Sequence, residues 1–305
     1  GIIINLINID VSEVKSFREC TRKWAFSSRN KMHLRAKEQK LPLRMGTAFH
    51  KAIERMYLGT YINLDDIIEE FEIDDQNAKM MELNLGGYYN NVLKHDLAKF
   101  AVVNTEHRFN IPLLTLVPDL YFVDLFNNAV NVTGSIDLIF RDRKTGRYGG
   151  LEHKYVRNFR PDVYEYLDEQ PKMYFYAIEH DFEGCEVIGI NQVRKLKTKF
   201  DHARTHMTYT PEQLDNFVEN FATTCIEIVR ATELIHFPAR PGYMSCQICD
   251  YAPLCLDMNE LGTDNINVID DPELLDELGF EKRLIDHLDE KEGCEIIGGD
   301  TCGPQ

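Results

Sequence analysis

Gly134-Ser-Ile-Asp-Leu-Ile-Phe140 and Tyr148-Gly-Gly-Leu-Glu-His-Lys154 are two apolar segments separated by a short polar stretch. Such segments predict two strands, and the shortness of the connection makes them antiparallel. Because side chains alternate along a strand, Glu152 and Lys154 are expected on the same face. The hairpin places Asp137 roughly opposite Glu152. Two carboxylates and one ammonium group are therefore expected to converge on one patch.

This patch has the chemistry of a hard-cation site. Mg²⁺ prefers carboxylate oxygens and usually keeps water or substrate phosphate in its other positions. A metal ion held by Asp137 and Glu152 would generate hydroxide and stabilise charge on a phosphodiester under attack. Lys154 would orient the water or share the negative charge. The alternative is a solvated polar face, which a pattern this short does not exclude.

Two further motifs lie at helical positions near the expected sheet. Gly46-Thr-Ala-Phe-His50 starts a segment whose apolar residues recur at helical spacing, so His50 is either a ligand or an ordinary surface histidine. In Gln170-Pro-Lys-Met-Tyr174, the Gln170 and Tyr174 side chains lie one helical turn apart on one face. They suit phosphate and base contacts, although ordinary packing would also explain them.

The rest of the pattern predicts an α/β protein with a mixed sheet. Periodicity predicts helices over residues 11–26, 47–58, 169–180 and 211–234. It predicts strands over residues 102–111, 113–125, 130–140, 147–155 and 186–194.

Three of the eight cysteines lie in the run Cys246-Gln-Ile-Cys-Asp-Tyr-Ala-Pro-Leu-Cys255, and Cys249 is its middle member. In a cytosolic chain such a run indicates a metal or cluster rather than disulfides. A [4Fe–4S] cluster or a structural zinc needs a fourth ligand, and Cys20 is the candidate. Zinc and unrelated buried thiols remain as alternatives.

The order of these motifs resembles the RecB-like branch of the PD-(D/E)XK nucleases over residues 12–255. The resemblance implies a restriction-endonuclease-like core, with a mixed central sheet flanked by helices. It also implies that Lys154 is the catalytic lysine and that Gln170 and Tyr174 hold the DNA strand. The metal would be bound by three side chains and one main-chain carbonyl: His50, Asp137, Glu152 and the carbonyl of His153. Glu106 resembles an acidic residue that often precedes the core, and it is left out of the catalytic set.

The cysteine pattern resembles the iron–sulfur branch of the same superfamily, which includes AddB-type nuclease domains and CRISPR adaptation exonucleases. This resemblance implies a structural [4Fe–4S] cluster that ties the two ends of the chain around the core; its ligands would be Cys20, Cys246, Cys249 and Cys255. A link that closes a loop of this length restricts the unfolded chain strongly. The sequence departs from the family at Thr21, where proline is usual, and at Pro171, where an apolar residue is common.

Charge divides the chain into residues 1–256 and 257–305. The net charge is −16, and residues 257–305 hold fifteen acidic and three basic side chains, so residues 1–256 carry only −4. We expect a nuclease domain over 1–256 and an acidic tail over 257–305, in which 274–288 forms either a helix or a mobile arm. The nearly neutral body is compatible with a local basic groove for DNA.

The sequence predicts a Mg²⁺- or Mn²⁺-dependent deoxyribonuclease, an exonuclease acting on single-stranded or frayed DNA ends. The setting would be recombination, repair or CRISPR-type DNA processing in the cytoplasm of a prokaryotic or phage-infected cell, with no signal peptide or membrane segment. No helicase P-loop occurs, so unwinding would need a helicase or recombination partner. The alternatives are a non-catalytic DNA-end-binding scaffold, a structure-specific endonuclease and an RNase.

Overall fold

The computed structural model describes residues 5–117 and 128–284 of the chain. The chain divides into two compact units. The first unit comprises Gly1–Glu38, Asn110–Gly134 and Asn216–Gln305, and the second comprises Gln39–Phe109 and Ser135–Asp215. The division at residue 256 that charge suggests is therefore not a boundary between these units.

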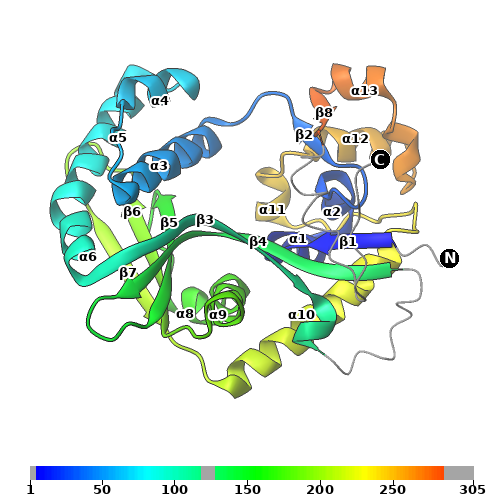
Figure 1. Cartoon of the computed structure of the whole chain (residues 1–305). Coiled ribbons are helices and arrows are strands. Elements are labelled where there is room, and N and C mark those ends of the chain that lie inside the picture. Colours follow the sequence, from blue (N-terminus) through cyan, green and yellow to red (C-terminus); the bar gives the residue numbers. More distant parts are fainter. Residues whose placement is uncertain (1–4, 118–127, 285–305) are drawn as a thin grey trace, which may run out of the picture. The chain divides into compact units, whose positions relative to one another are not determined.

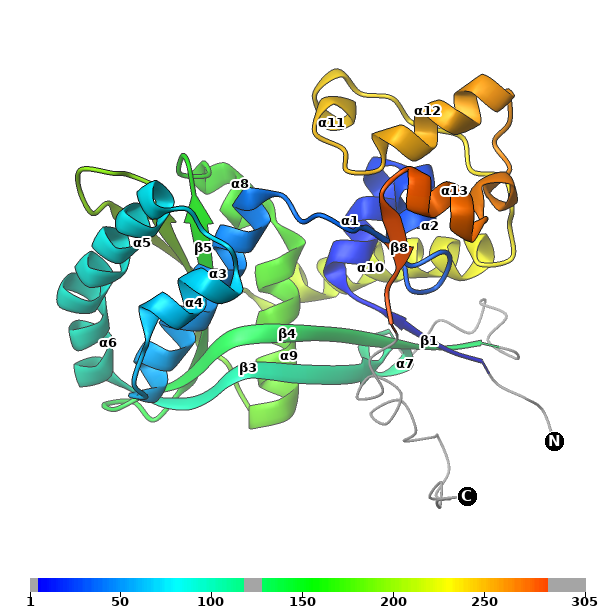
Figure 2. The same ribbon diagram turned by 90° about the horizontal axis from the view of Figure 1, so that it is seen from above.

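The sheet is mixed, as predicted. The strands that follow β4 (Asn128–Asp142) in the sheet are β5 (Tyr148–Val156), β6 (Val187–Arg194) and β7 (His202–Met207). The β4–β5 and β6–β7 pairs are antiparallel and the β5–β6 pair is parallel. β3 (Phe100–Pro112) pairs with β4, as Figure 2 shows. β7 was not predicted, because its polar sequence lacks the apolar alternation of a strand.

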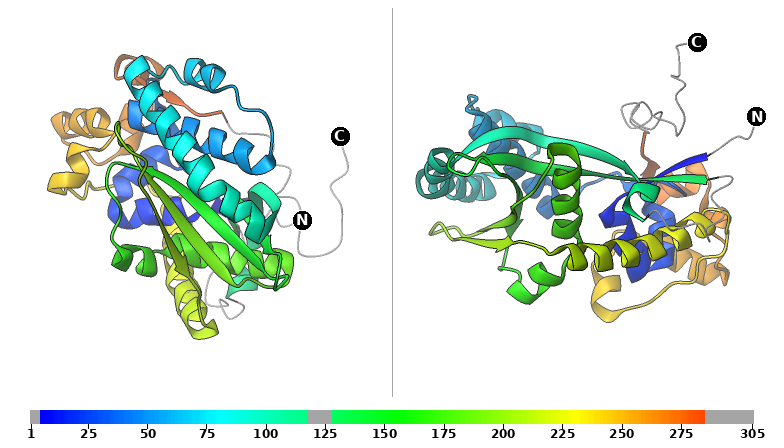
Figure 3. Two further views of the ribbon diagram at one scale, coloured as in Figure 1. Left: turned by 90° about the vertical axis from the view of Figure 1, so that its left-hand side faces the viewer. Right: turned by 60° about the horizontal axis from the view of Figure 1, so that its bottom comes forward.

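Helices cover both faces of this sheet in the second unit. α3 (Leu41–Leu58) is followed by α4 (Leu64–Glu70), α5 (Asp75–Tyr88), the π-helix η1 (Tyr89–Leu93) and α6 (Lys94–Lys99) on one side (Figure 1). α8 (Asp162–Leu167) and α9 (Glu169–Phe182) lie on the other, and Figure 3 shows α9 against the strands. The side chains of α3 and α5 pack with those of β5 in one apolar core that includes Phe49, Leu85, Leu151 and Tyr155.

The first unit is mostly helical. Its short strand β1 (Asn5–Ile9) runs parallel to the first part of β4. Its other elements are α1 (Val11–Glu19), α2 (Thr21–Ser27), β2 (Leu34–Ala36), α7 (Leu113–Leu116), α11 (Tyr243–Gln247), α12 (Ala252–Leu261), the 3₁₀ helix η2 (Ile266–Ile269), α13 (Pro272–Glu277) and β8 (Phe280–Lys282). α10 (Pro211–Ala231) contributes residues to both units.

Three segments differ from the predictions. The helix expected over 11–26 breaks at Cys20, whose backbone is extended between α1 and α2. In the strand expected over 113–125, Leu113–Leu116 forms a helical turn after Pro112, and 118–125 lie outside the described residues. In 274–288, expected as either a helix or a mobile arm, α13 ends at Glu277, since Gly279 takes a φ of +83° and β8 follows; residues 285–288 lie outside the described residues.

The start of the acidic tail is folded. β8 pairs with β2 in antiparallel register, so residues from both ends of the described chain form one small sheet. The contacts of this sheet include Arg35 with Glu281 and Lys37 with Asp276. Residues 257–284 are therefore a structural part of the first unit. Among the described residues, no helix combines the length and apolar character needed to cross a membrane.

Candidate active site

The β4–β5 register brings the two predicted carboxylates together. Leu138 pairs with Leu151, so Asp137 and Glu152 are neighbours on adjacent strands, as predicted. Both are buried, with 8% and 4% of their surface exposed. The backbone N–H of His153 donates to Asp137 Oδ2 at 2.7 Å. This bond holds the Asp137 carboxylate beside the strand that carries Glu152.

His50 reaches the same patch from α3. Its Nδ1 lies 3.6 Å from Asp137 Oδ2. Single ligand atoms of His50, Glu106 and Asp137 all lie within 4.8 Å of one another, which is a spacing that can hold a metal ion. Glu106 has a φ of +47°, in the left-handed region that a glutamate rarely adopts. Such backbone strain is concentrated at functional sites. Glu106, left out of the predicted set, therefore belongs to this cluster.

Glu152 lacks part of the hydrogen bonding that a buried carboxylate needs. Its Oε1 lies 3.3 Å from Lys154 Nζ, whereas its buried Oε2 has no hydrogen-bond partner in the described part of the chain. Burial, and next the negative charge of Asp137, raise the pKa of Glu152 to about 8. An unsatisfied buried carboxylate oxygen is costly unless a cation or donor reaches it. These donor groups therefore fit a divalent cation.

Asp137 and His50 shift each other's pKa in opposite directions, and both shifts favour the charged forms. Burial opposes the charge on Asp137, but the hydrogen bond and positive charge of His50 outweigh it and lower the pKa of Asp137. Burial likewise opposes charge on His50, and the Asp137 contact outweighs it and raises the pKa of His50. Without metal, these two groups stabilise each other while Glu152 holds a proton. A metal ion would replace that proton.

α9 places the predicted DNA-holding pair beside the lysine. Lys154 Nζ lies 3.4 Å from Gln170 Oε1, and Gln170 Nε2 donates to the Tyr174 hydroxyl at 2.8 Å. α9 can approach β5 closely because Gly150 has no side chain, since a Cβ there would lie 2.8 Å from Ile178 Cδ1. The structure thus brings together the side chains predicted for metal, catalysis and DNA.

The opposite face of β5 carries His153, which is buried. Its ring stacks on Tyr57 at 5.6 Å between centroids, and its Nδ1 lies 3.1 Å from Asn191 Nδ2. Burial lowers the pKa of His153 to about 3, so the ring is neutral. Only its main chain is available to the carboxylate face.

A network of polar side chains surrounds His153. Asn191 Nδ2 also lies 3.0 Å from the Tyr88 hydroxyl, and its Oδ1 accepts from Arg204 at 2.6 Å. Arg204 donates two bonds to Asp96, at 2.8 and 2.7 Å. Asp96 also accepts from the Tyr57 hydroxyl. The sequence gives no sign of this network, because the residues around His153 come from five separate elements and form no motif.

The four predicted cluster cysteines all lie in the first unit. Cys20 separates α1 from α2, Cys246 lies on α11, Cys249 follows it, and Cys255 lies on α12. Burial raises the pKa of Cys249, and the nearby Cys20 raises it further.

Two of these sulfurs accept hydrogen bonds. Arg22 Nη1 donates to Cys255 Sγ at 3.2 Å, and the Gly242 N–H donates to Cys246 Sγ at 3.4 Å. In the described part of the chain, no three cysteine sulfurs lie within 4.8 Å of one another.

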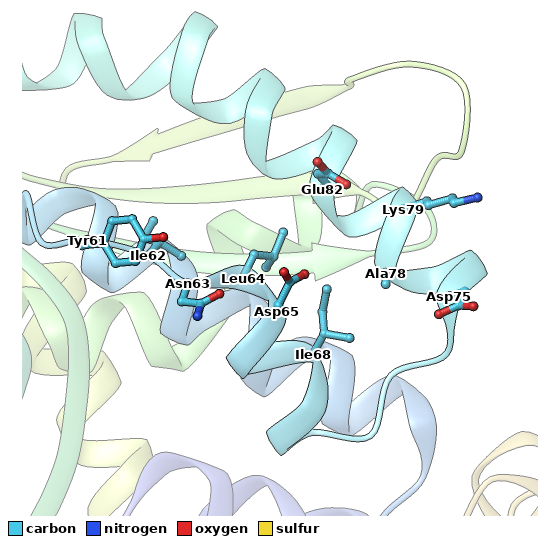
Figure 4. A pocket seen from close by; sticks show the side chains of 10 residues that line it. All are labelled: Tyr61, Ile62, Asn63, Leu64, Asp65, Ile68, Asp75, Ala78, Lys79 and Glu82. Atoms are coloured by element: carbon cyan, nitrogen blue, oxygen red, sulfur yellow. The ribbon is translucent and has the colours of Figure 1, made fainter.

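A separate pocket of about 380 Å³ lies between the segment before α4, α4 itself and α5 (Figure 4). Its lining includes Tyr61, Asp65, Asp75, Lys79 and Glu82. None of the predicted catalytic, metal-binding or DNA-binding residues lines it. The candidate active site is therefore the patch around Asp137 and Glu152.

Comparison with known proteins is consistent with this geometry. The family model described as the PD-(D/E)XK nuclease superfamily matches residues 9–256. The chain belongs to this superfamily. PD-(D/E)XK nucleases use divalent metal ions. No curated protein sequence matches the chain.

Two solved structures are similar at low identity. One, titled a "Putative exonuclease" from Eubacterium rectale, is 14% identical, with a TM-score of 0.48 over 74% of this chain and 81% of that chain. The other, SSO0001, is 12% identical, with a TM-score of 0.38 over 81% of this chain and 85% of that chain.

Proposed function

We propose that this PD-(D/E)XK nuclease is a Mg²⁺- or Mn²⁺-dependent deoxyribonuclease that degrades single-stranded or frayed DNA from an end. The observation that carries the proposal is the unpartnered, buried Oε2 of Glu152, which lies beside Asp137 and Lys154. A scaffold that only binds DNA has no need for this costly arrangement. A nuclease uses such an arrangement to bind a metal ion.

The metal-binding groups in this proposal are His50, Asp137, Glu152 and the carbonyl of His153. The bound ion would supply an activated water and stabilise negative charge on the phosphate. The His153 N–H keeps Asp137 oriented, and the Asp137–His50 contact keeps the imidazole directed at the patch. The strained Glu106 lies close enough to contribute a further oxygen.

Lys154 and the α9 pair act on the substrate in this proposal. Lys154 Nζ, between Glu152 and Gln170, is placed to orient water or to share the charge of the phosphate. Gln170 and Tyr174 hold the DNA strand. Their mutual hydrogen bond fixes both side chains before the substrate arrives, which reduces the entropy lost on binding.

A structural [4Fe–4S] cluster held by the four first-unit cysteines belongs to the same proposal. The hydrogen bonds from Arg22 and Gly242 to sulfur support it, because thiolate and sulfide atoms are better acceptors than neutral thiols. Iron and acid-labile sulfide in anaerobically purified protein, both lost in Cys255→Ser, are expected. Stoichiometric zinc without iron would contradict the cluster.

The cellular setting remains as the sequence suggested: DNA processing in the cytoplasm of a prokaryotic or phage-infected cell, with a helicase or recombination partner supplying unwinding. The remainder of the acidic segment, residues 285–305, is proposed as a docking arm or a DNA mimic. Because β8 pairs with β2, the deletion that tests this idea removes only residues 285–305. Unchanged activity and partner binding in that deletion would eliminate the idea.

The test of the function is degradation of end-labelled single-stranded DNA with Mn²⁺ by the wild type, by Glu152→Ala and by Glu179→Ala. Glu179 is an exposed carboxylate on α9 and serves as the matched control. Cleavage by the wild type and the control, but not by Glu152→Ala, is expected. Circular substrates distinguish an endonuclease from an exonuclease, and RNA substrates test for an RNase. If all three proteins bind DNA but none cleaves it, the scaffold alternative is supported.

A further inference from the structure

A second surface involves residues that lie in the sequence between Lys154 and Gln170. β5 ends at Val156, two residues after Lys154, and the chain then forms α8 before α9 brings Gln170. Val156 pairs with Arg194 in the parallel β5–β6 register. The carboxyl ends of both strands therefore meet at one edge of the sheet, and the residues that follow them lie side by side there. Figure 2 shows α8 at this end of β5.

The side of this edge that follows β6 is basic although the chain is acidic. Residues 194–199 contain four lysines and arginines and no carboxylate, in a chain of net charge −16, whereas α8 carries the carboxylates Asp162 and Glu165. Arg157 is exposed and Lys195 is partly exposed, and none of the described ion pairs involves either one. Burial, and next the charge of Arg157, lower the pKa of Lys195. Two neighbouring cations without a carboxylate partner provide a place where a phosphate would relieve repulsion.

Two aromatic rings on this edge are open to solvent. Phe159 is 36% exposed and Tyr164 is 43% exposed. The Arg194 guanidinium lies 5.6 Å from the Phe159 ring centroid, and the Arg160 guanidinium lies 5.1 Å from that of Tyr164. Exposed rings beside cations are the components with which proteins bind single strands: bases stack on the rings, and the cations follow the backbone.

The segment that carries these rings is held rigidly. Arg160 donates two bonds to Glu165, at 2.6 and 2.9 Å, and the Glu165 side chain is fully buried. The Arg160 backbone N–H also donates to Gln192 on β6 at 2.7 Å. Glu165 thus anchors α8 while the residues around it face solvent. A rigid surface loses little entropy when a strand binds.

We propose that this edge is a binding site for single-stranded DNA, on which bases stack against Phe159 and Tyr164 while Arg157 and Lys195 contact phosphates. The inference rests on the proposed nuclease function and assigns the surface that binds its single-stranded substrate. Arg157 follows Lys154 by three positions, which is about 10 Å at the rise of a β-strand. A strand held on this edge therefore reaches the catalytic patch. A duplex offers no free base faces to the rings, so the site selects unpaired DNA.

Fluorescence anisotropy, with Ca²⁺ replacing Mn²⁺ to prevent cleavage, tests this inference on the full chain. The probes are a labelled 20-nucleotide thymidine strand, an abasic strand of equal length and a duplex. The variants are Phe159→Leu/Tyr164→Leu, which keeps apolar packing but removes the rings, and Arg157→Ala/Lys195→Ala. The control is Tyr61→Leu/Lys79→Ala, which removes an exposed aromatic ring and an exposed cation at the separate pocket.

The wild type and the control should bind the thymidine strand about tenfold more tightly than the abasic strand, as stacking of one or two bases predicts. The ring variant should lose this preference while it keeps its abasic affinity. The cation variant should weaken both strands equally and reduce the salt dependence by about one to two phosphate contacts.

Unchanged preference in the ring variant would overturn the inference, as would tighter binding of the duplex than of the thymidine strand by the wild type. These outcomes are independent of catalysis. A protein that shows the base preference but never cleaves DNA would refute the proposed nuclease and retain this binding site. A protein that cleaves DNA with no contribution from these side chains would support the proposed nuclease and refute this binding site.

Discussion

The two faces of β5 differ sharply in how their polar groups are satisfied. On one face His153 lies in a network in which Asn191 and Arg204 both have hydrogen-bond partners. On the other face, one residue away, Glu152 is equally buried and one of its oxygens has no partner in the described part of the chain. The His153 and Glu152 side chains are both polar and buried. Only one of the two faces is complete without a ligand.

This difference distinguishes buried polar groups that stabilise the fold from buried polar groups that bind a ligand. A complete buried network stabilises one arrangement of the strands, and it costs stability only when a member is removed. A buried network with an unpaired group destabilises the ligand-free protein, and ligand binding restores that stability. Burial alone would not have distinguished Glu152 from His153. The hydrogen-bond inventory does.

The largest expected effect on stability comes from breaking the complete face. Asp96→Asn leaves the partly buried Arg204 guanidinium without its charged partner and should lower the free energy of unfolding by about 2–4 kcal/mol. Urea denaturation measures this change, with the exposed Glu179→Gln as the control. A loss below about 1 kcal/mol would show that the network contributes little.

A smaller effect of opposite sign is expected on the incomplete face. The pKa of Glu152 is raised from 4.5 to about 8, so the folded state binds this proton more tightly than the unfolded state. The resulting stability is present below about pH 4.5 and is lost as the pH rises towards 8. Glu152→Gln should therefore stabilise the metal-free protein by about 1–3 kcal/mol at pH 8.5 and hardly change it at pH 4.5. Destabilisation by Glu152→Gln at pH 8.5 would mean that Oε2 of Glu152 has a hydrogen-bond partner in the metal-free protein.

Proton release on metal binding follows from the same pKa. At pH 7 Glu152 holds most of a proton, and the raised pKa of His50 adds a further contribution, so at least about one proton should be released per ion bound. At pH 9 the release should fall close to zero. Calorimetry of Mn²⁺ binding in buffers of different ionisation enthalpy measures it. Equal release at both values of pH would assign the proton to another group.

The smallest effect is expected at the DNA-holding pair. Tyr174→Phe removes the hydroxyl to which Gln170 donates but keeps the ring. Because one neutral hydrogen bond contributes about 1 kcal/mol, KM for single-stranded DNA should rise about fivefold. The value of kcat should stay within a factor of about two. Steady-state kinetics with short oligonucleotides distinguish this result from a fall in kcat alone, which would place Tyr174 in the chemical step.

The sequence predicted the parts of the site that depend on local spacing. The Asp137–Glu152 register follows from two apolar strands and a short connection, and the Gln170–Tyr174 contact follows from one helical turn. The sequence could not predict the Asp96–Arg204 pair, whose members are 108 residues apart and lie in segments with no distinctive pattern.

The backbone geometry of Glu106 and the pairing of β8 with β2 explain the remaining differences. The strain at Glu106 is a property of φ, which composition does not encode. The acidic composition after residue 256 suggested a separate tail, yet β8 pairs with β2, near the other end of the chain. Its Phe280 stacks on Tyr251 and is buried, and a three-residue strand gives no periodic signal.

The central claim is that the incomplete face of β5 is a metal site, and Mn²⁺-dependent thermal stabilisation tests it most directly. Melting temperatures would be measured across a Mn²⁺ titration for the wild type, Glu152→Gln and Glu179→Gln. A saturable rise shared by the wild type and Glu179→Gln, and absent from Glu152→Gln, is predicted. An equal rise in all three proteins would place the metal elsewhere and contradict the account.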